Sequence, residues 1–187
     1  MSEMTEKVKD YFTSSKFKRE EIMDKLSEFL TVEKGGVKLY EAALKHVNDH
    51  EVKAKFHEFH KQTMRHEEIL TNIIGKLGGN PSHKSAGAKI AEEKATALLK
   101  TMNQTKGMSA KEAELNAIEN IVIAETKDHA DWELLGHIAH RSEDSDLANL
   151  LKPAVSEVEG QEDEHLSWTN KKMGELALKG LEKNGKH

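Results

Sequence analysis

The sequence predicts an all-α protein built around a bundle of four long helices. The 187 residues include only two prolines and are rich in Ala, Leu, Glu and Lys, a composition typical of helices. Apolar residues recur at steps of three and four over long stretches, as one buried helix face requires. Turn-forming residues interrupt these stretches at only a few places. The length suits a single domain.

The first expected pair of helices is bounded by two turn signals. A periodic stretch runs from about residue 16 to 47, and Asn48-Asp49-His50 interrupts it. A second stretch runs from about residue 51 to 77, where Gly78-Gly79-Asn80-Pro81-Ser82 ends it. A short loop between two long helices predicts an antiparallel hairpin.

The next segment, residues 83–108, is a long connection with weaker helical character over about 88–103. A long connection that contains a short helix predicts a crossover from one end of the bundle to the other. The alternative is a simple up-down bundle with a disordered linker. The helical pattern within the connection favours the crossover.

The second hairpin begins where Ser109 and Glu112 match a capping box. Its first helix is expected over about residues 110–141, followed by the loop 142–145 and a helix over about 146–179. Pro153 lies either in the first turn of that helix, where proline is tolerated, or further on, where it kinks the helix.

The bundle is therefore expected to occupy residues 16–179. Residues 1–15 are expected to form a polar lead-in, and residues 180–187 a frayed tail.

Composition excludes several classes of function. The net charge is −5, without a strong basic stripe, which argues against nucleic acid as a partner. The absence of cysteine excludes disulfides, thiolate zinc sites, cysteine nucleophiles and rubredoxin-type iron. No apolar run is long enough to span a membrane, and the N-terminus carries no apolar signal core. We therefore expect a cytoplasmic protein without membrane contact.

Polar residues interrupt the apolar stripe of every long helix near its middle. An isolated buried carboxylate is very unfavourable, so four coincident interruptions indicate one shared polar site. These residues are Glu33 in the first helix, Thr63 and His66 in the second, Glu125 and His129 in the third, and Glu162 and His165 in the fourth. The glycine pair Gly35-Gly36, which lowers helix propensity, permits either close helix packing or a local bulge.

Hairpin geometry and an internal repeat both support a shared site. Glu33 and His66 are equidistant from the first turn, and Glu125 and Glu162 from the second loop, so each pair lies at one height. Glu33 and Glu125 are each followed seven residues later by an aromatic residue, Tyr40 and Trp132, which we expect to pack in the core rather than to act in redox chemistry. The partner helices carry the parallel pentapeptides 62–66 and 161–165.

A Glu from each of two helices and a Glu-x-x-His from each of the other two form the di-iron carboxylate pattern. On these residues the sequence resembles the ferritin-like superfamily, nearest to rubrerythrin-like and bacterial stress-associated domains. The resemblance covers about residues 20–80 and 110–178. Its most recognisable passages are Glu33 through Tyr40, His66 through Pro81, and Glu162 to Trp168.

The resemblance implies a set of metal ligands. It makes Glu33 and Glu125 the single carboxylates, Glu162 with His165 a complete Glu-x-x-His, and His66 the histidine of the other. The carboxylate expected three residues before His66 is replaced by Thr63, with Gln62 beside it. Losing a bridging carboxylate lowers the affinity for at least one metal ion. The candidates to replace it are His129, which we include among the expected ligands, Asp128 and the more distant His60.

Three functions remain open from the sequence. The first is a metal-dependent oxidoreductase or oxidative-stress protein, in which iron reacts with peroxide or dioxygen and a separate partner supplies electrons. The second is a metal-binding protein without turnover, and the third is a metal-free helical interaction protein with a relic site. Manganese or zinc could replace iron at a site rich in oxygen and nitrogen. The resemblance also implies a homodimer.

Overall fold

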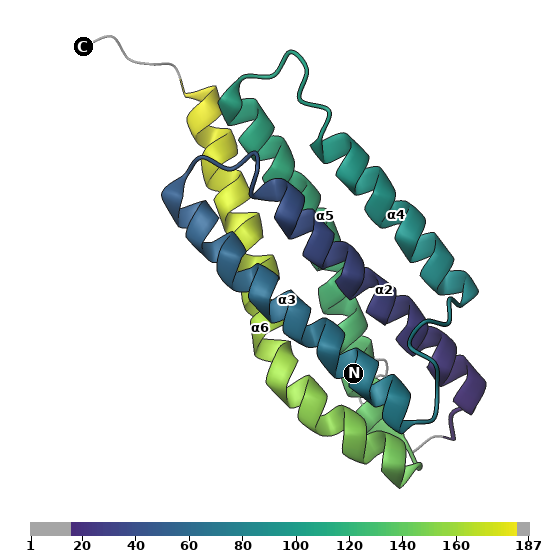
Figure 1. Ribbon diagram of the computed structural model, residues 1–187. Coiled ribbons are helices and arrows are strands. Elements are labelled where there is room, and N and C mark those ends of the chain that lie inside the picture. The colour runs from purple at the N-terminus through teal and green to yellow at the C-terminus, as the bar shows by residue number, and fades with distance from the viewer. Residues whose placement is uncertain (1–15, 183–187) are drawn as a thin grey trace, which may run out of the picture.

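The computed structural model describes residues 16–182, which contain five α-helices and no strand. Two antiparallel hairpins make the bundle (Figure 1). The first consists of α2 (Arg19–Ala43) and α3 (His50–Lys76), and the second of α5 (Ala110–Arg141) and α6 (Ser145–Leu181). The all-α bundle predicted from the sequence is confirmed. The expected lead-in, residues 1–15, lies outside the described residues, as do residues 183–187.

The helix α4 (Ala86–Met102) carries the chain from the end of α3 to the start of α5, which lie at opposite ends of the bundle (Figure 1). It runs alongside α2, and small residues let the two helices approach closely. A Cβ atom on Gly35 would lie 2.8 Å from the Cβ of Ala95. Since α2 is a continuous helix through Gly35 and Gly36, these glycines serve close packing rather than a bulge.

The helix boundaries agree with the sequence predictions at some ends and differ at others. The helix α2 ends at Ala43, earlier than expected, and the backbone N–H groups of Asn48 and Asp49 donate to Glu114 Oε1 at 3.0 and 2.8 Å. The predicted capping box of Ser109 and Glu112 is present at the start of α5. Pro153 lies inside α6 rather than in its first turn, and the helix continues past it, as far as Leu181. The tail thus begins slightly later than expected.

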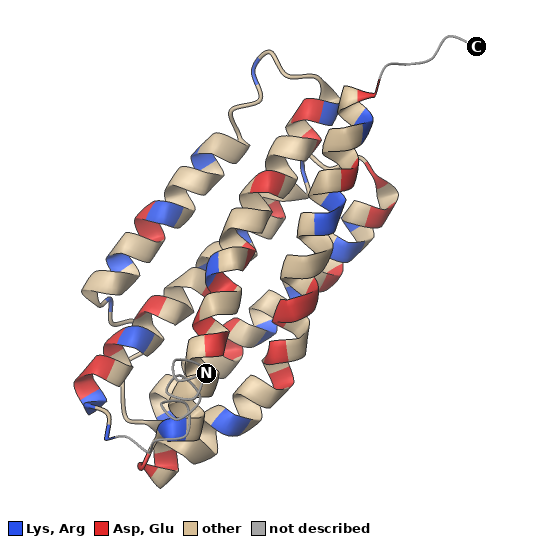
Figure 2. Cartoon of the chain, turned by 180° about the vertical axis from the view of Figure 1, so that it is seen from behind, with Lys and Arg blue, Asp and Glu red and all other residues tan. Residues whose placement is uncertain are grey.

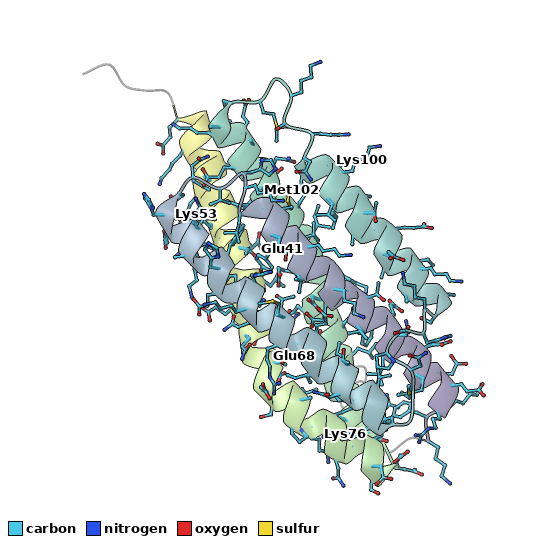
Figure 3. The ribbon with its side chains drawn as sticks, viewed as in Figure 1. Glu41, Lys53, Glu68, Lys76, Lys100 and Met102 are labelled. Atoms are coloured by element: carbon cyan, nitrogen blue, oxygen red, sulfur yellow. The ribbon has the colours of Figure 1, made fainter. Side chains whose placement is uncertain are left out.

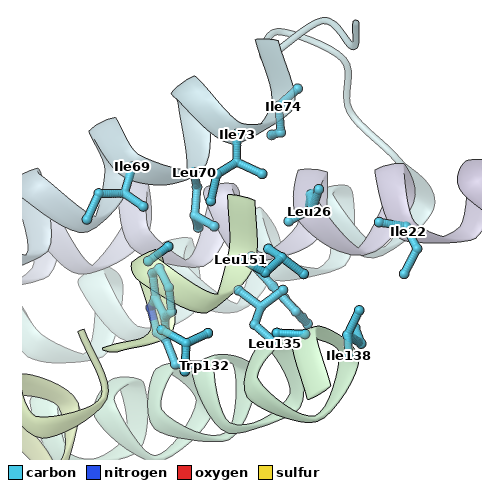
Figure 4. Close-up of a cluster of buried hydrophobic side chains, with 14 of the residues drawn as sticks. Ile22, Leu26, Ile69, Leu70, Ile73, Ile74, Trp132, Leu135, Ile138 and Leu151 are labelled. Atoms are coloured by element: carbon cyan, nitrogen blue, oxygen red, sulfur yellow. The ribbon is translucent and has the colours of Figure 1, made fainter. Parts of the chain in front are cut away.

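The apolar core is divided into two clusters. One contains Leu26, Leu70, Leu135 and Leu151, contributed by all four bundle helices (Figure 4). The other is rich in aromatic side chains from α2 and α3 together with Ile118 and Ile121 of α5. Most of the polar residues that interrupt the helix stripes lie between the two clusters: Glu33, His66, Glu125, Glu162 and His165.

Charged side chains of both signs are distributed over all the helices (Figure 2). Glu68 and Lys76 on α3 and Lys100 on α4 are examples of exposed charges, whereas Met102 at the end of α4 is fully buried (Figure 3). No helix in residues 16–182 is long and apolar enough to cross a membrane.

Candidate metal centre

Five of the six expected ligands meet in the middle of the bundle, and each is at most 2% exposed. They form two groups, in each of which the candidate ligand atoms lie within 4.8 Å of one another. The groups are Glu33, His66 and Glu162, and Glu125, Glu162 and His165. Glu162 belongs to both, so its carboxylate joins two positions that could each hold a cation. We call these five residues the carboxylate–histidine centre.

Six buried polar atoms of this centre have no hydrogen-bond partner. They are one oxygen of Glu33, one of Glu125, both of Glu162, and Nδ1 of His66 and of His165. Nδ1 of His66 lies 3.0 Å from Glu162 Oε1, and Nδ1 of His165 lies 3.2 Å from Glu125 Oε2. Buried polar groups are almost always satisfied. Six unsatisfied acceptors directed at one place therefore fit a divalent cation, which prefers such oxygen and nitrogen ligands.

Two glutamines orient the histidines. Nε2 of His66 bonds Gln161 Oε1 at 3.0 Å, and Nε2 of His165 bonds Gln62 Oε1 at 2.7 Å. The amide nitrogen of Gln161 donates to the Glu157 carbonyl, so its oxygen faces the ring. Because an amide oxygen only accepts, Nε2 carries the proton in each histidine and Nδ1 presents a lone pair to the centre.

The two aromatic residues of the repeat hold the single carboxylates. Trp132 Nε1 donates to Glu33 Oε1 at 2.6 Å, and the Tyr40 hydroxyl donates to Glu125 Oε1 at 2.7 Å. Both aromatic residues are buried in the core, as expected from the sequence, but they also act as hydrogen-bond donors. Each carboxylate thus has one oxygen fixed and the other free.

All four of these hydrogen bonds cross between the two halves of the repeat. The glutamine of one pentapeptide orients the histidine of the other, and the aromatic residue of one half holds the carboxylate of the other half. Sequence reasoning identified the repeat but missed these partners. The signal was the matching position of Gln62 and Gln161, and of Tyr40 and Trp132, in the two halves.

The structure does not bring His129 to the centre. Its side chain is 30% exposed, and its Nε2 lies 2.7 Å from Asp163 Oδ1 at the surface. Trp132 follows Glu125 by seven positions, and the residue between them on the buried face can be either the third or the fourth after Glu125. In the structure it is the third, Asp128, whereas the residue predicted from the sequence was the fourth, His129. The more distant candidate His60 lies 3.6 Å from Glu41 Oε1.

Asp128 is instead the additional buried acid. It is 4% exposed, and its nearby negative charge adds to burial in raising the pKa of Glu33. It also approaches the position of the missing carboxylate: a Cβ atom on Gly36 would lie 3.1 Å from Thr63 Cγ2 and 4.0 Å from Asp128 Oδ2. The Thr63 hydroxyl itself donates to the Phe59 carbonyl at 2.9 Å.

The dry environment sets the protonation of the centre. Burial raises the pKa of Glu33, Asp128 and Glu162 well above the ordinary range, and the neighbouring acids raise each of these pKa values further. Burial lowers the pKa of His66 to about 4, so its imidazole is neutral at physiological pH. Clustered buried acids cannot all ionise without a compensating cation. The centre therefore has the ligand atoms that could hold a metal ion, and without a cation its acids hold their protons more tightly than usual.

Comparison with known proteins identifies a family. No curated protein and no solved structure matches the chain. A family described as a domain of unknown function, DUF892, matches residues 18–172, which include the whole of the carboxylate–histidine centre. Since the match covers most of the sequence, the chain belongs to the DUF892 family.

Proposed function

We propose that this protein binds metal ions at the carboxylate–histidine centre and acts as an oxidoreductase that reacts with peroxide or dioxygen. Iron is the first candidate, with manganese and zinc as alternatives. The observation that supports the proposal is the pair of buried ligand groups that share Glu162, with six unpartnered acceptor atoms directed between them. Iron held by carboxylates and imidazoles supplies the redox chemistry.

Each residue of the centre has a role in this proposal. Glu33 and His66 hold one metal position, Glu125 and His165 hold the other, and Glu162 serves both. The two glutamines keep Nδ1 of each histidine free for a metal. The apolar clusters on both sides exclude water, which strengthens every charge interaction inside. Electrons would come from a separate donor, since the chain has no cysteine to hold an electron-transfer centre.

The two positions differ in charge. The group with Glu125, Glu162 and His165 contains a complete Glu-x-x-His, whereas Thr63 replaces the carboxylate that would belong to the group with His66. In that weaker group, burial and the charge of Asp128 also raise the pKa of Glu33, which must lose its proton before it can bind a cation. We therefore propose sequential binding, with the tighter position nearer Glu162 and His165.

Anaerobic titration of the chelator-treated protein with ferrous iron tests this order. His165→Ala should abolish the tighter binding event, His66→Ala should mainly affect the weaker one, and Thr63→Glu should raise the metal content. Two equal, tight binding events that Thr63→Glu leaves unchanged would contradict the asymmetry and show that Asp128 already replaces the missing carboxylate. An absence of binding even in Thr63→Glu would refute the metal proposal and favour a metal-free interaction protein.

The threonine at position 63 favours a second candidate, a metal-binding protein without turnover. Peroxide consumption by protein loaded with iron or manganese separates the two candidates. Turnover that requires the bound metal supports the oxidoreductase, whereas stoichiometric binding without peroxide consumption supports the second candidate.

A further inference from the structure

A cavity of about 600 Å³ lies between α2, α4 and α5. Protein interiors are usually close-packed, and a space of this size matches the sites that bind small organic molecules. Small residues, glycine and alanine, occupy much of the wall that α2 and α4 contribute. Along α2 the wall extends from Lys25 to Leu39, which corresponds to about 21 Å at the helical rise of 1.5 Å per residue.

The wall is mainly apolar and opens to solvent. Val32, Leu39, Leu98 and the half-buried Ala124 line the cavity, and the exposed side chains of Ile90 and Ile123 lie along its opening. Exposed large apolar side chains on both sides of an opening favour an apolar ligand over a polar one.

The inner wall reaches the carboxylate–histidine centre. Glu125 and Asp128 both line the cavity and are nearly fully buried. One oxygen of Glu125 has no hydrogen-bond partner. The cavity therefore borders residues of the centre, whose carboxylates stay buried from solvent.

One basic side chain of the wall is available for an anionic ligand. Lys25 and Lys127 lie 2.8 and 3.3 Å from Glu28, and Lys127 also pairs with Asp131. Lys94 lines the same cavity from α4 and is exposed, and no ion pair within residues 16–182 involves it. An apolar wall with one unpaired ammonium group matches an amphiphile that carries a single negative charge.

We propose that the cavity binds a small amphiphile, an elongated apolar chain with a carboxylate or similar anionic head that pairs with Lys94. The apolar chain lies along Val32, Leu39 and Leu98, with Glu125 and Asp128 at the inner wall. Under the proposed function, this amphiphile is the substrate class of the oxidoreductase, and only this assignment rests on that function. Binding itself needs no metal.

The test uses the full chain after chelator treatment. The probe is the anionic dye 1-anilinonaphthalene-8-sulfonate, and decanoate and its neutral analogue 1-decanol compete with it. We expect saturable binding of one dye per chain and stronger displacement by decanoate than by decanol. Lys94→Glu should weaken decanoate binding about five- to tenfold, the effect of about 1 kcal/mol at a partly exposed ion pair.

Matched variants separate the cavity from other surfaces. Lys100→Glu makes the same charge change on α4 at an exposed position outside the wall and should leave decanoate binding unchanged. Ala124→Phe should fill part of the cavity and weaken the binding of both competitors at least about tenfold. A circular-dichroism melt shows whether that variant folds, and Ile123→Glu, at an exposed position, serves if it does not, by repelling decanoate at the opening.

Each outcome bears on one proposal. The absence of saturable dye binding, or equal decanoate binding in the wild-type protein, Lys94→Glu and the cavity variant, overturns the cavity proposal. Equal displacement by decanol and decanoate overturns the role of the anionic head. Ferrous iron titration of Lys94→Glu reports separately on the metal proposal, because Lys94 belongs to neither ligand group. Failure of metal binding with intact decanoate binding would leave the cavity proposal standing.

Discussion

Replacement of Glu162 by glutamine should have opposite effects on the metal-free and the metal-loaded protein. In the metal-free state the carboxylate is buried, both of its oxygens lack partners, and burial raises its pKa well above the ordinary range. A glutamine of the same shape removes the titratable group. Its amide nitrogen can donate to Nδ1 of His66, which lies 3.0 Å from Glu162 Oε1.

The size of the effect follows from this geometry. An unsatisfied buried polar group costs about 1–3 kcal/mol, so Glu162→Gln should raise the free energy of unfolding of the chelated protein by about that amount. For a chain of this size, 1 kcal/mol corresponds to about 2–4 °C in Tm, which predicts an increase of about 2–12 °C. Wild-type protein should gain about 2.7 kcal/mol from a metal present at about 100 times its Kd, whereas Glu162→Gln should gain little.

Thermal unfolding followed by circular dichroism, with chelator and with ferrous iron under anaerobic conditions, measures both effects. Glu159→Gln is the matched control, since Glu159 is an exposed carboxylate on the same helix. The reasoning is refuted if Glu162→Gln lowers the Tm of the chelated protein, or if it retains the wild-type gain on addition of metal.

Two further predictions concern the same centre, and a third concerns assembly. Gln161→Leu should weaken the metal position of His66 about 10–100-fold by releasing the ring, which a metal titration detects, while the position of His165 keeps its affinity. The free energy of unfolding of the chelated protein should fall as the pH rises above 6.5, because its buried acids have raised pKa values and keep protons that the unfolded chain has lost. With metal present, denaturant unfolding should show the opposite trend, because the ligands must lose their protons to bind the metal ion. Below that pH the lowered pKa of His66 acts in the opposite direction, between about 6.5 and about 4, because the unfolded chain then binds the extra proton. We also propose a homodimer, and a monomer mass in light scattering across concentrations would contradict it.

The fold was largely accessible from the sequence because its boundaries are local signals. The break at Asn48-Asp49-His50 and the capping box of Ser109 and Glu112 each act within a few residues. The end of α2 was placed too late, and the contact of Glu114 with the backbone N–H groups of Asn48 and Asp49 was missed, because Glu114 lies far away in the sequence. The position of α4 against α2, and hence the cavity, could not be predicted for the same reason.

The polar centre was accessible in part. Helical periodicity placed Glu33, Glu125 and Glu162 on the buried faces, and hairpin symmetry placed them at one height. Periodicity did not distinguish Asp128 from His129, because both fit a seven-residue interval between two buried positions. The preceding buried residues Ile118 and Ile121 continue through Glu125 with alternating steps of three and four, and this register selects Asp128.

The crossed hydrogen bonds make the two halves of the repeat interdependent. Each histidine depends on a glutamine of the other half, so neither hairpin alone can present a complete and oriented ligand set. The two halves stay connected even though Thr63 replaces the carboxylate that the repeat would place there. Asp128, contributed by α5, lies near Gly36 on the α2–α3 side, and its charge helps to raise the pKa of Glu33. Through Asp128, the second hairpin therefore adds an acid beside the group that lacks one, and the raised pKa of Glu33 is a feature that separates the two proposed metal positions.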